Sequence, residues 1–439
     1  MKTISANPVH LPVLPATPAD GDAVRFHGSV YRIREMSGFA FVILRTARDL
    51  VQTIYIPGEA AFELAAIGEG DCVDASGIVK IEPRSKLGYD IILREVRVLS
   101  GPAGELPLVI NKKELGLPLD ANLQARSLCL RNQRERAIFK LQEGVARGFR
   151  EYLTGEGFTE IHTPKIVAAG AEGGSNIFAL EYFGRRAYLA QSPQLYKQAM
   201  VGVFERVFEI GPVFRAEKHD TSRHLNEYTS MDFEMGYIRN HEDVMAVETA
   251  MLRHTMALLQ AEYGAELKEL NVKLPEIAAI PSIRFMEAKE ILKTECKHTV
   301  TDYHDFEPVE EQLLCDWVKK QTGSEFVFVT HYPSAKRPFY AMDDPVEPAY
   351  TLSFDLLFRG LEVTTGGQRI HSWQAQVDKM LARGMNPEDF EAYLLSHKSG
   401  LPPHGGLGLG LERLVMKLVG LDNVRRACLY PRDIQRLEP

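Results

Sequence analysis

The chain has 439 residues, of which 45% are hydrophobic and 25% charged, and its formal net charge at pH 7 is −8. This length predicts two or more domains, and the acidic balance disfavours a protein whose whole surface binds nucleic acid. Because the chain lacks an apolar run of about 20 residues, a signal peptide and any C-x-x-C spacing among its five cysteines, we expect a cytoplasmic protein with reduced thiols and no membrane partner.

The first part of the chain predicts a small β-domain. Residues 1–20 are rich in Pro and Ala and read as a flexible lead. Residues 21–104 hold five short strand patterns, with a helical pattern at 59–68 between the third and the fourth. This order is typical of a five-stranded OB-fold β-barrel, which binds oligonucleotides on one sheet face. An unrelated small β-domain is the alternative.

The rest of the chain predicts a larger α+β domain. Residues 105–132 are rich in Pro, Gly and Leu and read as a hinge or linker, and residues 133–439 form the second domain. It opens with an amphipathic helix at 133–153. Because the later strands and helices do not alternate strictly, we expect a mainly antiparallel β-sheet flanked by helices.

Two strand patterns in this domain have one polar and one apolar face. In 227–237 the period of two places Tyr228, Ser230, Asp232 and Glu234 on the same side. The run 350–358 divides in the same way. An antiparallel sheet can keep one face wet, so these strands could form the floor of an active site. Plain solvent-facing strands are the alternative.

Charged residues near these strands suggest a phosphate site. Arg215, at a strand end, is the best candidate for a triphosphate, because its planar guanidinium holds two oxygens and stays ionised; Arg223 and His224 are further donors. Asp355 and Glu362 are spaced to lie near adjacent strand ends, where paired carboxylates could hold Mg²⁺. A charged surface hairpin and structural ion pairs are the alternatives.

The Gly-rich passage at 402–421 leads from a strand into a helix. Its glycines would let the backbone approach a ligand closely, and Arg413 opens the helix. The passage is neither a GxxxxGK[ST] loop nor a well-placed GxGxxG unit. A Walker site or a dinucleotide site is therefore disfavoured.

Three runs together resemble the signature motifs of class II aminoacyl-tRNA synthetases: GFTEIHTPKI with Pro164, PxF-R-x-E from Pro212 to Glu217, and GLGLGLER ending in Arg413. The runs QSPQLYKQ, RHLNEYTSMDFEM, GGQRIH and LYPRD are similar to aspartyl-tRNA synthetases. The short distance from Asp232 to Gly408 leaves no room for the extra domain of the bacterial form. The chain therefore resembles the archaeal and eukaryotic type over nearly its whole length, apart from residues 1–20 and 265–325.

The resemblance implies a homodimer that activates L-aspartate with ATP and Mg²⁺ and transfers it to tRNA(Asp). It implies that Arg215 contacts the α-phosphate, Tyr228 stacks on adenine, Arg413 closes over ATP and His224 contacts the γ-phosphate. Glu217 would face the adenine or the tRNA end. The implied ATP site comprises Arg215, Glu217, Arg223, His224, Tyr228, Glu362, Gly410 and Arg413, with Arg215, Glu217 and Arg413 as its catalytic members and Asp355 and Glu362 as metal ligands.

Aspartate adds requirements of its own. Its ammonium group calls for carboxylates, which the resemblance assigns to Asp232 and Glu172. Its side-chain carboxylate calls for cations, assigned to Lys197 and Arg369, with Ser192 and Gln194 beside them. Asparagine would leave the two cations without a counter-charge, so we expect aspartate to be the substrate.

The resemblance also assigns an anticodon site and a dimer contact. Phe41, Arg45 and Gln52 match the anticodon contacts, and the dimer would form around Pro164. Ser29 and Lys86 give mixed signals, which leave open whether tRNA(Asn) is charged as well. The alternatives are an asparaginyl-tRNA synthetase and a catalytically silent tRNA-binding relative. Silent relatives typically lose the motif arginines, which are present here.

Overall fold

The computed structural model describes residues 14–15, 17–168, 176–218 and 220–439. The chain divides into two compact units, Met1–Leu115 and Gly116–Pro439. Each is described by itself.

The first unit is a closed five-stranded barrel with strand order β1-β2-β3-β5-β4. In β2 and β3 buried residues alternate with partly exposed ones, as expected of strands that line a barrel core with one face. The interior is filled by side chains such as Phe26, Val42 and Leu93. The OB-type barrel predicted from the strand order is confirmed. Its strands are β1 Ala23–Met36, β2 Phe39–Arg45, β3 Leu50–Tyr55, β4 Cys72–Ile81 and β5 Tyr89–Ser100.

The helix predicted at 59–68 is wrong. This stretch forms only the 3-10 turn η1, Leu64–Ala66, in which no residue is buried. Phe62 packs instead on Tyr55, with ring centroids 5.2 Å apart. Leu64 also packs on the barrel core, and the Ala61 amide donates to the carbonyl of Arg94 at 2.7 Å, so separate contacts with the barrel hold this connection in place of helical hydrogen bonds.

The second unit is built on an eight-stranded sheet with order β12-β13-β14-β15-β16-β11-β10-β6. All neighbouring pairs are antiparallel except β12 with β13 and β10 with β6, which confirms the mainly antiparallel sheet. The strands are β6 Thr159–Glu160, β10 Arg206–Phe214, β11 Glu227–Gly236, β12 Ser282–Arg284, β13 Phe326–Thr330, β14 Ser353–Phe358, β15 Leu361–Gln368 and β16 His404–Gly410.

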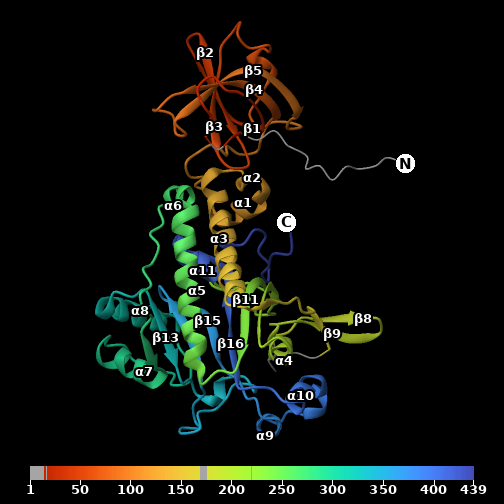
Figure 1. Ribbon diagram of the computed structural model, residues 1–439, viewed down its shortest axis with the longest axis vertical. Helices are drawn as coiled ribbons and strands as arrows, with labels where there is room; N and C mark the ends of the chain where they lie inside the picture. The colour runs from red at the N-terminus through yellow and green to blue at the C-terminus, as the bar shows by residue number, and fades with distance from the viewer. Residues whose placement is uncertain (1–13, 16, 169–175, 219) are drawn as a thin grey trace. The chain divides into compact units, whose positions relative to one another are not determined.

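Long helices cover one face of this sheet (Figure 1). Asn132 caps α3 by accepting from the amides of Arg134 and Glu135 at 3.0 and 3.2 Å. Gly148 lets α3 lie close to α5, since a Cβ there would be 2.8 Å from Thr255 Oγ1. The helices are α1 Leu119–Gln124, α2 Arg126–Cys129, α3 Gln133–Gly155, α4 Gln194–Phe204, α5 His241–Glu262, α6 Gly264–Leu270, α7 Phe285–Thr294, α8 Pro308–Thr322, α9 Trp373–Ala382, α10 Glu391–Lys398 and α11 Leu411–Val419. Short 3-10 turns lie at η2 Ser334–Lys336, η3 Pro387–Phe390 and η4 Val424–Ala427.

The main core lies between α3, α5, α11 and the covered sheet face. It contains the apolar side of β11, including Met231 and Phe233. The polar side of the same strand is thereby turned to the opposite face. This is the division that the period of two predicted.

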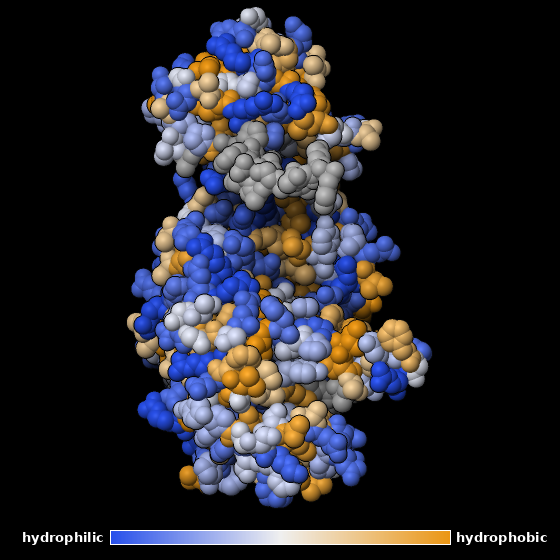
Figure 2. Space-filling view, turned by 45° about the vertical axis from the view of Figure 1, so that its right-hand side comes forward, coloured by the Kyte–Doolittle hydropathy of each residue, from blue (hydrophilic) through white to orange (hydrophobic). Residues whose placement is uncertain are grey.

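A small sheet of order β7-β9-β8 projects from the unit (Figure 1). Its strands are β7 Ile166–Val167, β8 Ala179–Tyr182 and β9 Arg185–Leu189. Hydrophobic side chains reach the surface here, and the turn residue Phe183 is 89% exposed. Orange residues also stand out on this projection in the space-filling view (Figure 2). Within the described ranges, no helix is both long enough and apolar enough to cross a bilayer.

Candidate active site

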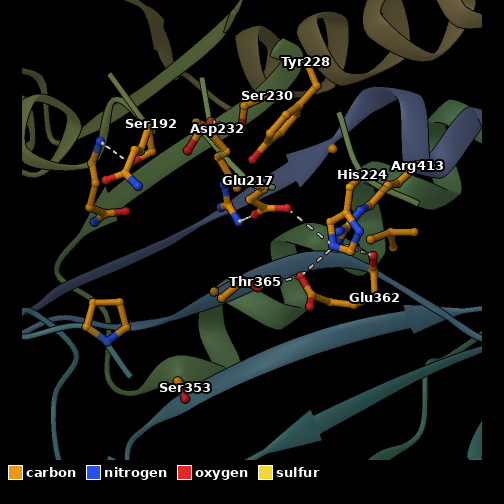
Figure 3. Close-up of a pocket in the computed structure, with 18 of the residues that line it drawn as sticks. Ser192, Glu217, His224, Tyr228, Ser230, Asp232, Ser353, Glu362, Thr365 and Arg413 are labelled. Carbon is orange, nitrogen blue, oxygen red and sulfur yellow. Dashed lines mark hydrogen bonds and ion pairs between the residues drawn. The ribbon is translucent and has the colours of Figure 1, made fainter. Parts of the chain in front are cut away.

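A cavity of about 320 Å³ opens on the uncovered face of the large sheet. Arg215, Arg369 and Arg413, which are far apart in the chain, all line it. Ser192 and Asp232 lie on one side of it, and His224, Glu362 and Arg413 on the other (Figure 3). The residues proposed from sequence that line it are Ser192, Gln194, Arg215, Glu217, Arg223, His224, Tyr228, Asp232, Glu362, Arg369, Gly410 and Arg413.

The strand register explains why these residues meet. Asp355 pairs with Thr365, Thr365 with Gly408, and Gly408 with Asp232. Glu209 extends this row across a fifth strand by pairing with Asp232. One row of the antiparallel sheet therefore aligns acidic residues from three strands, and Asp232, Gly408 and Thr365 of this row line the cavity.

Glycines in β16 make room for the carboxylates of β11. A Cβ at Gly406 would lie 2.3 Å from Glu234 Oε2, which is closer than packing allows. A Cβ at Gly408 would lie 3.1 Å from Asp232 Oδ1. The Gly-rich run is therefore needed here for close approach of side chains from the neighbouring strand.

One side of the cavity, which we call the buried end, is formed by Asp232 and Arg369 of the wall together with their partners Lys197 and Glu234. Lys197 Nζ lies 2.9 Å from Asp232 Oδ1 and donates to the carbonyl of Leu407 at 2.7 Å. Arg369 Nε donates to Glu234 Oε1 at 3.0 Å, and its Nη2 donates to the carbonyl of Gly406 at 2.8 Å. The side chains of both cations are nearly inaccessible, with 2% exposed for Lys197 and 6% for Arg369.

The charges of the buried end cancel in pairs. Burial by itself would raise the pKa of Glu234, but the nearby charges of Arg369 and Lys197 outweigh it and hold that pKa below its usual value. The guanidinium of Arg369 also faces the ring of Tyr340, with 5.5 Å from Cζ to the ring centroid. A ligand with both cationic and anionic groups can therefore exchange partners here without bringing in net uncompensated charge.

The opposite side, which we call the open end, consists of Arg215, His224, Glu362 and Arg413. Arg215 keeps 40% of its side chain exposed and lies over the ring of Tyr228, with 5.7 Å from Cζ to the centroid. Arg413 Nη1 donates to the backbone carbonyl of Glu362 at 3.1 Å. Exposed cations converging on a cavity can receive an anion with several oxygens, such as a phosphate chain.

The carboxylates proposed for a metal lie at this end. Burial favours the neutral forms of both, yet the pKa of Glu362 is lowered by Arg413, Arg337 and Arg215, whereas that of Asp355 is raised. Asp355 Oδ2 accepts from Arg337 Nη2 at 2.7 Å, and its buried Oδ1 has no hydrogen-bond partner. The described residues contain no cluster of three or more His, Cys, Asp or Glu side chains suited to a metal. Two carboxylates with a spare oxygen fit Mg²⁺ that completes its shell with phosphate oxygens and water.

The loop between β10 and β11 receives an ion pair from a distant helix. Arg223 Nη2 pairs with Glu311 Oε2 of α8. Burial raises the pKa of Glu311 to about 7, against the opposing effect of Arg223. The segment 265–325, which carried little of the sequence pattern, thus contributes a residue beside the cavity.

Sequence reasoning missed several wall residues. Gln191 is the first residue of the run 191–198, and Thr365 lies on β15, the strand that also carries Glu362. The run KRPFY at 336–340 has two adjacent cations followed by aromatic residues, a pattern that could have indicated a place for an anionic ligand. The missed residues include Gln191, Lys336, Arg337, Pro338, Tyr340, Thr365 and Glu412.

Other residues proposed from sequence lie off the cavity wall. Lys197 donates to Asp232, and Asp355 accepts from Arg337, so each of the two contacts a residue of the wall without lining the cavity itself. Pro164 is an exposed residue just before β7, and Glu172 lies outside the described residues. The remaining three, Phe41, Arg45 and Gln52, are partly exposed and alternate with buried neighbours on β2 and β3, so they share the outer face of the barrel.

Comparison with known proteins gives consistent results. Residues 118–434 match the family described as "tRNA synthetases class II (D, K and N)". The chain is 44% identical over 426 residues to an "Aspartate--tRNA(Asp/Asn) ligase" of Deinococcus radiodurans, covering 96% of each chain. It is 39% identical over 426 residues to an "Aspartate--tRNA(Asp) ligase" of Pyrococcus abyssi, covering 96% of this chain and 97% of that one. A solved asparaginyl-tRNA synthetase of Pyrococcus horikoshii, complexed with asparaginyl-adenylate, superposes with a TM-score of 0.87 at 30% identity, covering 96% of this chain and 97% of that one.

Proposed function

Because the chain belongs to the class II tRNA synthetases of the D, K and N group, we propose that it is an aspartate–tRNA ligase that uses ATP. The observation that carries the proposal is the convergence of Arg215, Arg369 and Arg413 on one cavity floored by carboxylates. Its buried end suits a small zwitterionic acid, and its open end suits a triphosphate.

In the first step, a carboxylate oxygen of aspartate attacks the α-phosphorus of ATP. A bond from that oxygen to phosphorus forms, the bond from phosphorus to the bridging oxygen breaks, and pyrophosphate leaves with the electron pair. Arg215 would stabilise charge on the α-phosphate, and Arg413, Arg223 and His224 would hold the other phosphates. Alignment of the two substrates at opposite ends of one cavity accounts for much of the catalysis.

In the second step, the terminal ribose hydroxyl of tRNA attacks the carbonyl carbon of aspartyl-adenylate and AMP leaves. Neither step needs a covalent bond to the enzyme. Asp355 and Glu362 would hold Mg²⁺, which supplies positive charge against the triphosphate when bound. Tyr228 would stack on the adenine, opposite the guanidinium of Arg215.

Choice of amino acid follows from the buried end. The substrate ammonium group would pair with Asp232, and its side-chain carboxylate with Arg369 and Lys197. Asparagine is neutral at this position and would leave a buried cation without its second partner. That difference supports discrimination on the order of 10³.

The test is ATP–pyrophosphate exchange with each amino acid in turn. We expect exchange with aspartate and little with asparagine. A solved asparaginyl-tRNA synthetase has a similar fold, so activation of asparagine is the competing possibility. Exchange driven by asparagine and not by aspartate overturns the proposal. Normal aspartate-driven exchange in both Lys197→Ala and Arg369→Ala would show that the substrate assignment is wrong.

The barrel is proposed to bind the anticodon. Phe41 and Phe39 form an edge-to-face pair with centroids 5.2 Å apart on the outer barrel face, beside Arg45 and Gln52. Base stacking on such a ring contributes about 1 to 3 kcal/mol. Phe41→Ala should raise the KM for tRNA and leave exchange unchanged. Charging of tRNA(Asp) and tRNA(Asn) side by side decides the tRNA range.

A homodimer in the cytoplasm completes the proposal. The support for a dimer is the exposed apolar surface of the small sheet next to Pro164, including Ile166 and Phe183. Sedimentation should give twice the monomer mass. A Phe183→Asp variant that sediments unchanged would exclude this surface as the contact.

A further inference from the structure

The loop that joins β10 to β11, residues 215–226, carries two groups proposed for the triphosphate, Arg223 and His224. Neither belongs to a strand or helix. Thr221 organises this stretch, because its Oγ1 lies 2.6 Å from His224 Nδ1 and accepts from the Arg223 amide at 3.4 Å. Thr221 thus contacts one side of the His224 ring, while His224 Nε2 lies 3.6 Å from Glu217 Oε2.

Arg425 of η4 grips this part of the loop. Its Nη1 donates to the carbonyl of Thr221 at 3.1 Å, and its Nη2 to Asp220 Oδ1. Its Nε donates to Asp433 Oδ2 at 2.6 Å. Only 7% of the side chain is exposed, so a buried guanidinium joins the loop to the C-terminal segment with all three of its nitrogens.

Neighbouring residues of the C-terminal segment reinforce the same contact. The amide of Val424 donates to the carbonyl of Ser222 at 2.8 Å, and Gln435 Nε2 donates to Asp220 Oδ2 at 3.2 Å. Asn423 caps η4 by accepting from the Arg425 amide at 3.0 Å. The three residues directly before Arg223 are therefore each held from η4 or from the segment that follows it.

Fixing a loop residue costs backbone entropy, and a ligand that must order the loop loses the corresponding binding free energy. A loop ordered before ATP arrives removes this loss. We propose that Arg425 is a positioning residue that holds residues 220–224 in place for the triphosphate of ATP. This rests on the proposed function, because it assigns the role of the loop in that reaction.

The experiment compares Arg425→Ala, Arg425→Lys and Asp220→Asn in aspartate-dependent exchange. For Arg425→Ala we expect the KM for ATP to rise about tenfold or more, with the KM for aspartate changed less than twofold. Arg425→Lys keeps the charge but not the three donor nitrogens of the guanidinium, so its KM for ATP should lie between those of the wild type and Arg425→Ala. Asp220→Asn leaves the pair of Arg425 with Asp433 intact; Asp220 is 42% exposed, so this variant tests the loop contact if Arg425→Ala folds poorly.

Arg426→Ala is the matched control, because that side chain pairs with Asp422 and no described contact joins it to the loop. It should behave as the wild type. Hydrogen–deuterium exchange of the substrate-free protein gives an independent readout. The amides of 220–224 should exchange faster in Arg425→Ala and Asp220→Asn than in the wild type and Arg426→Ala.

Unchanged amide exchange in both loop variants overturns the inference. So does a rise in both KM values together, because the effect would then not be specific to ATP, or a fall in kcat alone, which a smaller fraction of folded enzyme would produce. If the wild type shows no aspartate-dependent exchange of pyrophosphate, the proposed function fails. In that event the amide exchange still decides whether Arg425 orders the loop.

Discussion

At the buried end of the cavity Lys197 and Arg369 are each paired with a carboxylate away from solvent, whereas at the open end Arg215 and Glu362 keep 40% and 35% of their side chains exposed. The buried end is formed by α4 and the central strands. Much of the open end lies on the loop before β11 and at the start of α11. The difference indicates that recognition of the small substrate relies on fixed, desolvated ion pairs, while recognition of the triphosphate relies on solvated arginines held by the surrounding loop contacts.

The largest effect should come from breaking an ion pair of the buried end. Arg369→Ala removes the cation that donates to buried Glu234 and leaves it only Lys197, 3.5 Å away, so we expect aspartate-dependent exchange to fall at least about 10³-fold and the free energy of unfolding to drop by about 3 kcal/mol or more. Exchange assays and urea unfolding measure the two effects. Arg239→Ala, which removes an exposed pair with Asp243, is the control and should change neither. Exchange within tenfold of wild type would contradict the contrast between the two ends.

At the open end the same kind of change should affect ATP and spare stability. In Arg413→Ala we expect kcat/KM for ATP to fall about 100-fold, with the free energy of unfolding nearly unchanged, because this arginine is partly exposed. Arg413→Lys retains the charge, so its kcat/KM for ATP should lie between those of Arg413→Ala and the wild type. A large loss of stability would show that the open end is as strongly coupled to the fold as the buried end.

A buried carboxyl group that has no cation beside it offers a further comparison with the paired charges of the buried end. Glu248 of α5 is fully buried, neither of its oxygens has a hydrogen-bond partner, and burial raises its pKa to about 8 from 4.5. Folding therefore favours the protonated form. The stabilisation that protonation gives is complete below about pH 4.5, falls as the pH rises and is lost above about pH 8.

Glu248→Gln should remove this dependence on pH. We expect the variant to be more stable than the wild type at pH 8 to 9, by about 2 to 4 kcal/mol, and the difference to shrink toward pH 5. Urea unfolding at several pH values measures it, with the exposed Glu242→Gln of the same helix as control. A difference that does not vary with pH would mean that Glu248 does not titrate in this range.

The smallest effect should come from salt. Exposed charges are screened at high ionic strength and buried pairs much less, so raising the salt from about 0.05 to 0.5 M should raise the KM for ATP a few-fold more than the KM for aspartate. Steady-state exchange at constant Mg²⁺ measures both constants. Equal changes in the two KM values would show that the two ends of the cavity do not differ in how far salt screens their charges.

Several features could be predicted from the sequence. The strands of the barrel, the helix α3 and the two-faced strand β11 follow from local period and composition, and the structure confirms them. The helix expected at 59–68 was wrong because contacts with the barrel, such as Phe62 on Tyr55 and the Ala61 amide on the Arg94 carbonyl, hold this stretch in a non-helical path. Local patterns fail where a tertiary contact replaces regular structure.

Which groups can bind a nucleotide and an amino acid is evident from residue type and period, because both are local properties. The contacts that divide those groups between the two ends of the cavity depend on the folded chain. The tertiary structure placed Lys197 behind Asp232, paired Arg337 with Asp355, and brought Glu311 and Arg425 to the loop that carries Arg223 and His224. The reason is that each of these pairs joins residues distant in sequence, and strand register and burial, not local pattern, decide which charges come within hydrogen-bond distance.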